Sequence, residues 1–293
     1  LTGGASAGLV AAFATLLAHG DRVALARPGY PAYRNALRAL GREAVEIDCG
    51  PEVGYRLTAD ALAGAPGPLH AVVAASPANP TGATLNADEL AGIARVCRER
   101  GAWLLSDEIY HGLTYGRRAV CALEVEPHAL VINSFSKLYR MPGWRLGWLV
   151  APPEVVARLD ACLINFFLTP AAPSQRAALA AFDELPALRA SVATYARNRA
   201  RLLEALPRIG CRNVVAPEGA FYFYVDVAHL TDDSLWFCRR LLDETGLSLA
   251  PGIDFDPDGG RSCVRLSFAL REAEVEDAIA RLGDWFARQA GRG

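Results

Sequence analysis

Lys137 is the only lysine among 30 lysine and arginine residues, so the other 29 are arginines. A guanidinium group stays protonated in proteins, whereas a lysine ε-amine can lose its proton and attack a carbonyl carbon to form a Schiff base. Arginine can supply ion pairing and solvation, so a single retained primary amine indicates imine chemistry. A stray surface lysine is the alternative, and the neighbouring residues decide between the two.

A tyrosine, an amide and a carboxylate follow three β-rich runs. Tyr30 stands in a loop rich in proline and glycine, where its ring can stack on a flat ligand or pack against its own loop. Asn79 lies between two prolines that fix a turn, and its amide either faces a ligand or supports the turn. Asp107 ends a third run and Tyr110 follows it. The two fall on one side if the chain turns helical there, and a helix N-cap is the alternative for Asp107.

Hydroxyl groups and a guanidinium surround the lysine. Ser134 and Ser136 precede Lys137, and Arg145 follows it eight residues later. These side chains are the types that bind an anionic group.

The opening run Leu1–Leu9 is rich in small residues and leads into a helical pattern that ends near residue 20. Backbone N–H groups at such a helix start face an anion, usually phosphate, although an ordinary glycine-rich cap is the alternative. The run also resembles the start of short-chain dehydrogenases. Those enzymes need a tyrosine four residues before the catalytic lysine, and position 133 is asparagine.

Short β-rich runs alternate with helical patterns, such as residues 86–100, in the first half of the chain. This alternation is typical of a mostly parallel sheet covered on both faces. Ligands bind such sheets beyond the carboxyl ends of the strands, where the residues above are found. The predicted strands are Arg22–Ala26, Ala44–Asp48, Ala71–Ala75, Trp103–Ser106, Leu130–Ser134 and Leu146–Val150.

The pattern changes beyond Pro152. A long helical run at about Pro186–Leu206 would link two lobes, and shorter strands and helices follow it. We therefore expect an α/β fold: a three-layer large domain with a mostly parallel sheet at residues 1–190, and a smaller C-terminal α+β domain at residues 191–293 that includes the linking helix. The later elements are predicted at Glu218–Asp226, Ser234–Thr245, Ser262–Phe268 and Glu272–Gln289.

Arg265 lies in the last predicted strand. Val264, Leu266 and Phe268 share one face of that strand, which leaves Arg265 on the other face with Ser267. An exposed arginine is the simplest interpretation for any one of 29. A functional role for Arg265 therefore needs evidence beyond this pattern.

One ligand uses the groups that follow the strands together with the helix start. Pyridoxal phosphate has an aldehyde for Lys137, a pyridine nitrogen that needs a carboxylate, and a ring oxygen that accepts hydrogen bonds. Its phosphate requires a helix start, hydroxyl groups and an arginine. The sequence therefore predicts pyridoxal 5'-phosphate as the cofactor.

The chain also resembles the class I/II aminotransferases, the aspartate-aminotransferase-like family of fold type I. Six motifs carry the resemblance in family order, from Thr2 to the C-terminal helix. They are Thr2–Ser6, Pro28–Pro31, Ser76–Gly82, Ser106–Tyr110, Ser134–Lys137 and Gly143–Gly147.

The resemblance implies a role for each candidate residue. Lys137 would form the Schiff base and act as general base and acid, and Asp107 would pair with the pyridine nitrogen. Asn79 and Tyr110 would contact the ring oxygen, and Tyr30 would stack on the ring. The phosphate would be held by backbone N–H groups of Ala5, Ser6 and Ala7 together with Ser134, Ser136 and Arg145. The substrate carboxylate would bind Arg265, with Asn79 beside it.

Composition excludes several classes of protein. The formal net charge is −2 and no basic run occurs, so neither nucleic acid nor an anionic membrane is expected as a partner. The apolar run Leu9–Ala18 is too short to span a bilayer and lacks the basic leader of a signal peptide. Seven scattered cysteines favour reduced thiols in a cytoplasmic protein over disulfides or a zinc site, and no metal is expected.

The resemblance implies a homodimeric transaminase that moves an amino group between an L-amino acid and a 2-oxo acid. Two alternatives share the same residues: the ligand-sensing domain of a transcription regulator, and a β-lyase or decarboxylative synthase. The chain starts inside the expected phosphate motif, so we expect it to lack the N-terminal arm and part of the small domain that family members carry.

Overall fold

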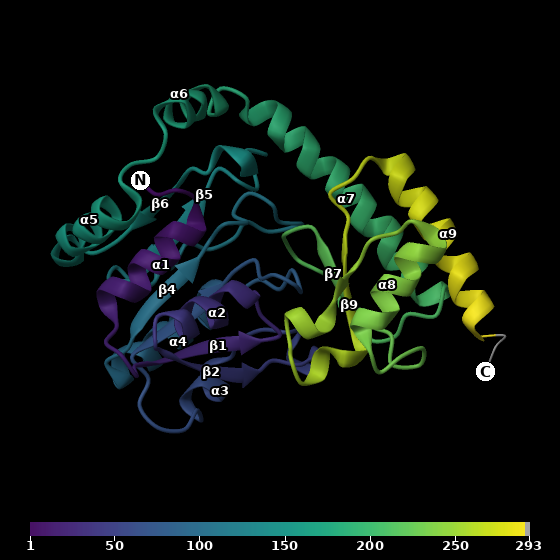
Figure 1. Ribbon diagram of the computed structural model, residues 1–293, viewed down its shortest axis with the longest axis horizontal. Coiled ribbons are helices and arrows are strands. Elements are labelled where there is room, and N and C mark those ends of the chain that lie inside the picture. Colours follow the sequence, from purple (N-terminus) through teal and green to yellow (C-terminus); the bar gives the residue numbers. More distant parts are fainter. Residues whose placement is uncertain (291–293) are drawn as a thin grey trace.

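The computed structural model describes residues 1–290, which contain a six-stranded and a three-stranded sheet (Figure 1). The larger sheet has the order β2-β1-β3-β4-β5-β6, and only β6 runs antiparallel to its neighbour. The predicted α/β fold with a mostly parallel sheet is therefore confirmed. The strands are β1 (Arg22–Arg27), β2 (Glu43–Asp48), β3 (Ala71–Ala75), β4 (Trp103–Asp107), β5 (Leu130–Ser134) and β6 (Gly147–Val150).

Helices cover both faces of this sheet. On one face, Phe13 and Leu37 pack against Val23 and Leu25 of β1, together with α1 (Ala5–Leu16), α2 (Pro31–Ala39) and α5 (Pro153–Phe167). On the other face, Ala24 joins the core formed with α3 (Ala59–Ala63) and α4 (Ala87–Arg100). Successive residues of β1 thus enter different cores because side chains alternate along a strand.

Local sequence signals set the ends of α4. Asn86 and Glu89 form a capping box, in which each side chain accepts a hydrogen bond from the other residue's backbone N–H. Gly101 ends the helix at a φ of 66°, a conformation that glycine adopts without steric cost. The predicted helix therefore has its expected bounds, with Asn86 as the cap.

The second part of the chain begins with α6 (Ala172–Ala181) and α7 (Leu185–Arg208). Figure 1 shows α7 running from α6 to the elements around the smaller sheet. That sheet is antiparallel with the order β7-β9-β8. Its elements are β7 (Tyr222–Asp226), α8 (Ser234–Thr245), β8 (Ala250–Pro251), β9 (Cys263–Ser267) and α9 (Glu272–Ala290).

We call the larger sheet and its covering helices the large lobe, and the smaller sheet with α8, α9 and the segments between these elements the small lobe. The core of the small lobe includes Phe223, Phe237 and Trp285. Val264 and Leu266 of β9 enter it, as predicted from their alternation. The expected boundary between residues 190 and 191 falls within α7.

The short 3₁₀ helices are η1 (Pro51–Val53), η2 (Ala122–Glu124), η3 (Pro142–Trp144), η4 (Gly252–Asp254) and η5 (Gly259–Ser262). Residues 109–112 form turns, so the helix considered after Asp107 is absent from this stretch. Asp107 instead closes a turn by accepting a hydrogen bond from the Ile109 N–H at 3.1 Å. Only residues 222–226 of the predicted run Glu218–Asp226 form a strand.

All seven cysteines are free thiols. None of the helices within residues 1–290 combines the length and the hydropathy needed to cross a bilayer.

Candidate functional site

A cavity of about 480 Å³ lies at the carboxyl ends of the parallel strands. Ten of the twelve predicted site residues line it. Ala7 and Ser134 do not line it: Ala7 is in the first turn of α1, and Ser134 Oγ accepts a hydrogen bond from the Ser136 N–H at 3.0 Å. The ten lining residues are Ala5, Ser6, Tyr30, Asn79, Asp107, Tyr110, Ser136, Lys137, Arg145 and Arg265.

Sheet topology explains why residues far apart in the sequence meet here. Asp107 is the last residue of β4, whereas Tyr30, Asn79 and Lys137 follow the ends of β1, β3 and β5 within four residues. Parallel strands bring their carboxyl ends to one edge, so all four side chains reach the same cavity.

The start of α1 forms an anion site at one end of the cavity. Gly4 caps the helix at a φ of 87° and no side chain caps it, so the first N–H groups keep their hydrogen-bonding capacity. The Arg145 guanidinium lies next to Gly4: a Cβ added at position 4 would stand 2.5 Å from one of its terminal nitrogens. Helix dipole and guanidinium together favour a phosphate group.

Asp107 is a buried carboxyl group that accepts two hydrogen bonds. The Tyr33 hydroxyl donates to its Oδ2 at 2.5 Å, and the Ile109 N–H donates to its Oδ1. Burial raises the pKa of Asp107, although the hydrogen bonds from Tyr33 and Ile109 and the charge of Lys137 act in the opposite direction. Such a carboxylate is stabilised by a ligand that brings a positive charge next to it.

Lys137 has the environment of a reactive amine. Its Nζ lies 5.6 Å from the ring centre of Tyr110 and 6.0 Å from that of Phe221. Burial lowers its pKa, and the positive charges of Arg265 and Arg145 lower it further, whereas Asp107 acts in the opposite direction. A lower pKa increases the neutral, nucleophilic fraction of the amine at a given pH.

The Arg265 guanidinium lies between two aromatic rings. Its guanidinium carbon lies 4.3 Å from the ring centre of Tyr222 and 4.7 Å from that of Phe255. One terminal nitrogen donates to Asn79 Oδ1 at 2.8 Å, whereas the buried Nε has no hydrogen-bond partner within residues 1–290. An oriented guanidinium with unused donors is suited to a carboxylate.

Three residues that contact the predicted site residues were not predicted. Tyr33 donates to Asp107, Tyr222 shares a 3.0 Å hydrogen bond with Tyr110, and Phe255 packs on Arg265. Tyr33 stands three residues after Tyr30, so helical spacing was an available signal for it. No local pattern indicates that Tyr222 lines the cavity or that Phe255 packs on Arg265, because both contacts depend on how distant parts of the chain pack.

The cavity therefore contains the chemical groups that pyridoxal phosphate requires. They comprise an anion site at a helix start, a buried carboxyl group, a lysine of lowered pKa and tyrosine hydroxyls. Burial raises the pKa of both Tyr110 and Tyr222, so their hydroxyls stay protonated as donors.

Comparisons with known proteins agree with this chemistry. The family model described as aminotransferase class I and II matches residues 1–282. A valine–pyruvate aminotransferase of Mycobacterium tuberculosis is 47% identical over 293 residues, which cover 99% of this chain and 76% of that protein. An aspartate/prephenate aminotransferase of Thermus thermophilus is 34% identical over 298 residues, which cover 100% of this chain and 75% of that protein.

Solved structures show the same likeness. The crystal structure of an aminotransferase from Mycobacterium tuberculosis matches with a TM-score of 0.95 at 47% identity, over 98% of this chain and 75% of that one. Thermus thermophilus aspartate aminotransferase with maleate matches with a TM-score of 0.89 at 33% identity, over 97% of this chain and 74% of that one. The chain therefore belongs to the class I and II aminotransferases, a family of transaminases that use pyridoxal phosphate.

Proposed function

We propose that the cavity binds pyridoxal phosphate and transfers the amino group of an apolar amino acid, with valine as donor and pyruvate as acceptor. One observation supports this most strongly: Lys137, Asp107 and Arg265 line a single cavity although they come from three distant parts of the chain. The group types match a reaction between an amine and an aldehyde next to a bound carboxylate.

Each of the predicted residues would contact a particular part of the cofactor. Backbone N–H groups of Ala5, Ser6 and Ala7 would hold the phosphate together with Arg145 and the hydroxyls of Ser134 and Ser136. Ser134 Oγ is the acceptor in the bond from the Ser136 N–H, so within residues 1–290 its hydroxyl hydrogen stays available to donate. In the ring region, Tyr30 would stack on the pyridine, Asn79 and Tyr110 would contact the ring oxygen, and Asp107 would hold the protonated nitrogen.

When bound, pyridoxal phosphate supplies an aldehyde that captures an amino group and a ring that accepts electrons. Lys137 would hold the aldehyde until a substrate amine replaces it. Its freed Nζ would then accept the proton from the substrate Cα, a step that needs the neutral amine, whose fraction the lowered pKa increases. Asp107, whose carboxylate is stabilised by the hydrogen bonds from Tyr33 and Ile109, would keep its negative charge next to the ring nitrogen and so favour the protonated ring.

The substrate would be oriented by its carboxylate. Arg265 would bind it with its unused donors, and Asn79 lies within hydrogen-bond distance of the same guanidinium. Within residues 1–290, the cationic residues that line the cavity are Lys137, Arg145 and Arg265, all of which already have a role. The wall also includes apolar residues that would accept an apolar substrate side chain: Leu9, Val10, Ala32, Ala36 and Ile109.

The valine–pyruvate aminotransferase of Mycobacterium tuberculosis, at 47% identity, supports this choice of substrates. The test is to load the protein with pyridoxal phosphate and to mix it with single amino acids. Valine should convert the Schiff-base absorbance band into the pyridoxamine band and release its 2-oxo acid, and pyruvate should reverse the change. Conversion by aspartate but not by valine would contradict the substrate, and ammonia together with pyruvate as products would indicate a lyase.

Borohydride reduction followed by peptide mapping tests the lysine. The cofactor label should be found on the peptide that contains Lys137, and the variant Lys137→Arg should remain unlabelled and inactive. Label on any other residue would contradict the assignment of the site.

We further propose that the protein acts as a cytoplasmic homodimer whose large and small domains comprise residues 1–190 and 191–293. The free thiols are consistent with a reducing compartment. Large apolar side chains are exposed on α5, α6 and the link between them, including Phe166 and Leu168 at 76% and Leu179 at 64%. Such a surface is suited to burial against a second copy. Sedimentation equilibrium should give twice the chain mass.

A further inference from the structure

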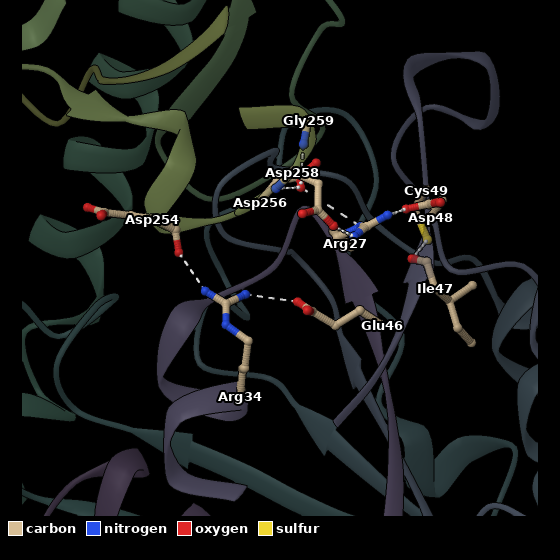
Figure 2. Close-up of polar contacts among 10 residues, drawn as sticks. All are labelled: Arg27, Arg34, Glu46, Ile47, Asp48, Cys49, Asp254, Asp256, Asp258 and Gly259. Carbon is tan, nitrogen blue, oxygen red and sulfur yellow. Dashed lines mark hydrogen bonds and ion pairs between the residues drawn. The ribbon is translucent and has the colours of Figure 1, made fainter. Parts of the chain in front are cut away.

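The small-lobe segment Asp254–Asp258 is bound to the large lobe by two arginines. Figure 2 shows Arg27 reaching the carboxylates of this segment and Arg34 reaching its backbone. Arg34 donates to the Asp254 carbonyl oxygen at 3.2 Å and to Glu46 Oε1 at 2.8 Å. The segment is therefore held at its first residue by Arg34 and at its last residues by Arg27.

Arg27 contacts carboxylates from both lobes. It is the last residue of β1 and is paired in register with Asp48 at the end of β2, whose Oδ1 accepts from its Nε at 2.7 Å. From the small lobe, Asp256 Oδ1 lies 3.8 Å from the same Nε, and Asp258 accepts from a terminal nitrogen. One guanidinium thus joins the edge of the large sheet to the small lobe.

Asp256 also folds its own loop. Its Oδ1 accepts hydrogen bonds from the backbone N–H groups of Asp258 and Gly259, at 3.0 and 2.8 Å. The loop therefore presents Asp258 to Arg27 in a defined conformation. A displacement of Asp258 would therefore disturb the hydrogen bond from its N–H to Asp256.

Phe255 lies between the two anchored ends. Its carbonyl oxygen accepts from the Gly29 N–H at 3.0 Å, and its buried ring packs 4.7 Å from the Arg265 guanidinium. The Tyr222 ring lies 4.3 Å from the same guanidinium, so the two rings restrict its orientation. A displacement of Phe255 would release this restriction.

We propose that Arg27 and Arg34 are positioning residues for substrate binding, because they hold Phe255 against Arg265 and thereby orient the guanidinium toward the substrate carboxylate. The inference rests on the proposed role of Arg265 in carboxylate binding. Neither arginine lines the cavity, so neither touches substrate or cofactor. Bidentate recognition depends on orientation, which makes affinity sensitive to small displacements of Arg265.

Two carboxylates on Arg27 provide a matched pair of variants. The side chains of Asp48 and Asp258 are equally exposed, at 77% and 76%, and both pair with Arg27. Asp48 joins two strands of the large sheet, whereas Asp258 joins the lobes. Asp258→Asn should weaken binding of 3-methylbutanoate, which is valine without its amino group, to the protein loaded with pyridoxal phosphate by about twofold to fivefold. Asp48→Asn should leave this affinity unchanged.

Arg27→Gln removes the contacts with both small-lobe carboxylates, and its affinity for 3-methylbutanoate should fall by about tenfold. KM for the amino acid should rise by a similar factor, while kcat and the affinity for pyridoxal phosphate stay within about twofold of wild type. Arg27→Lys should recover part of the affinity. Arg22→Gln is the control, because Arg22 pairs with Glu43 at the opposite end of β1 and β2.

Arg265→Gln separates the two proposals. If it abolishes binding of 3-methylbutanoate while Asp258→Asn and Arg27→Gln bind like wild type, the positioning role is overturned and the carboxylate site stands. If Arg265→Gln binds as tightly as wild type, the carboxylate role of Arg265 in the proposed function is wrong. A fall in kcat with unchanged KM in Arg27→Gln would also overturn positioning.

Discussion

Burial moves the two central ionisable groups toward their neutral forms. It lowers the pKa of Lys137 and raises that of Asp107, and each group's charge opposes the shift of the other. The protein thus maintains a lysine that loses its proton more easily and a carboxyl group that binds a proton more readily than it would in water. Tyr33 limits the second effect, because its hydrogen bond stabilises the carboxylate.

Asp107→Asn should change the stability of the cofactor-free protein in a pH-dependent way and should lower kcat. The folded pKa of Asp107 is raised above its unfolded value, so the folded state binds more protons between these two values. Its contribution to the free energy of unfolding therefore falls as the pH rises through that window and stays low above it. The asparagine amide cannot ionise, so the stability of the cofactor-free variant relative to wild type should be higher at pH 7 than at pH 4.

Denaturant unfolding of both cofactor-free proteins at the two pH values measures this difference. The same substitution should lower kcat by roughly a hundredfold or more, because the charge aimed at the ring nitrogen is lost. Relative stability that is equal at both pH values would show that Asp107 does not have a raised pKa in the folded chain.

At the scale of single elements, the start of α1 depends on two residues distant in sequence. Gly4 takes a positive φ that favours glycine, and its missing side chain leaves room for the Arg145 guanidinium. Arg145 in turn donates to the Gly3 carbonyl oxygen at 3.3 Å and to that of Pro142 at 2.9 Å. The helix start and the guanidinium therefore form one anion site.

Gly4→Ala should weaken binding of pyridoxal phosphate by about tenfold, because the added Cβ would displace Arg145 and because the backbone of Gly4, at a φ of 87° and a ψ of 170°, costs alanine about 1–3 kcal/mol. Gly20→Ala is the matched control: its φ is +83°, and within residues 1–290 its Cβ would meet no heavy atom within 4 Å. Both variants should lose similar stability in thermal unfolding. Equal affinities of Gly4→Ala and Gly20→Ala for pyridoxal phosphate in equilibrium dialysis would contradict the role of the space next to Gly4.

At the scale of the whole molecule, α7 is tied to the strand that carries Arg265. The fully buried Asn198 of α7 donates from Nδ2 to the carbonyl oxygens of Phe268 at 3.1 Å and Leu270 at 2.8 Å, directly after β9. Buried carbonyl groups need such donors. The long helix thus supports the small lobe through hydrogen bonds as well as through apolar packing.

Asn198→Leu should lower the free energy of unfolding by about 2 kcal/mol, because the buried Phe268 carbonyl group and the partly buried Leu270 carbonyl group lose their donor. Asn165→Ala on α5 is the control, since its side chain is exposed and donates within its own helix, and its effect should stay within about 0.5 kcal/mol. Urea unfolding measures both. A similarly small effect for Asn198→Leu would mean that water or a shift of the chain replaces the lost hydrogen bonds.

The sequence by itself determined the strands of the larger sheet, the bounds of α4 and the residues at the strand ends. Each depends on neighbours within a few positions: alternation assigns a face, a capping box starts a helix, and proline and glycine close a turn. Parallel strands then bring their ends to one edge, so the positions of Asn79, Asp107 and Lys137 followed from the pattern alone.

The tertiary structure decided which distant side chains meet. Tyr33 reaches Asp107 across 74 positions, Arg265 reaches Asn79 across 186, and Arg27 reaches Asp258 across 231. The local sequence around Asp107 also allowed a helix, whereas the structure has turns there. Local rules determine the direction in which a side chain leaves the backbone. The contacts that it makes depend on the packing of the two lobes, and this packing depends on all contacting elements together.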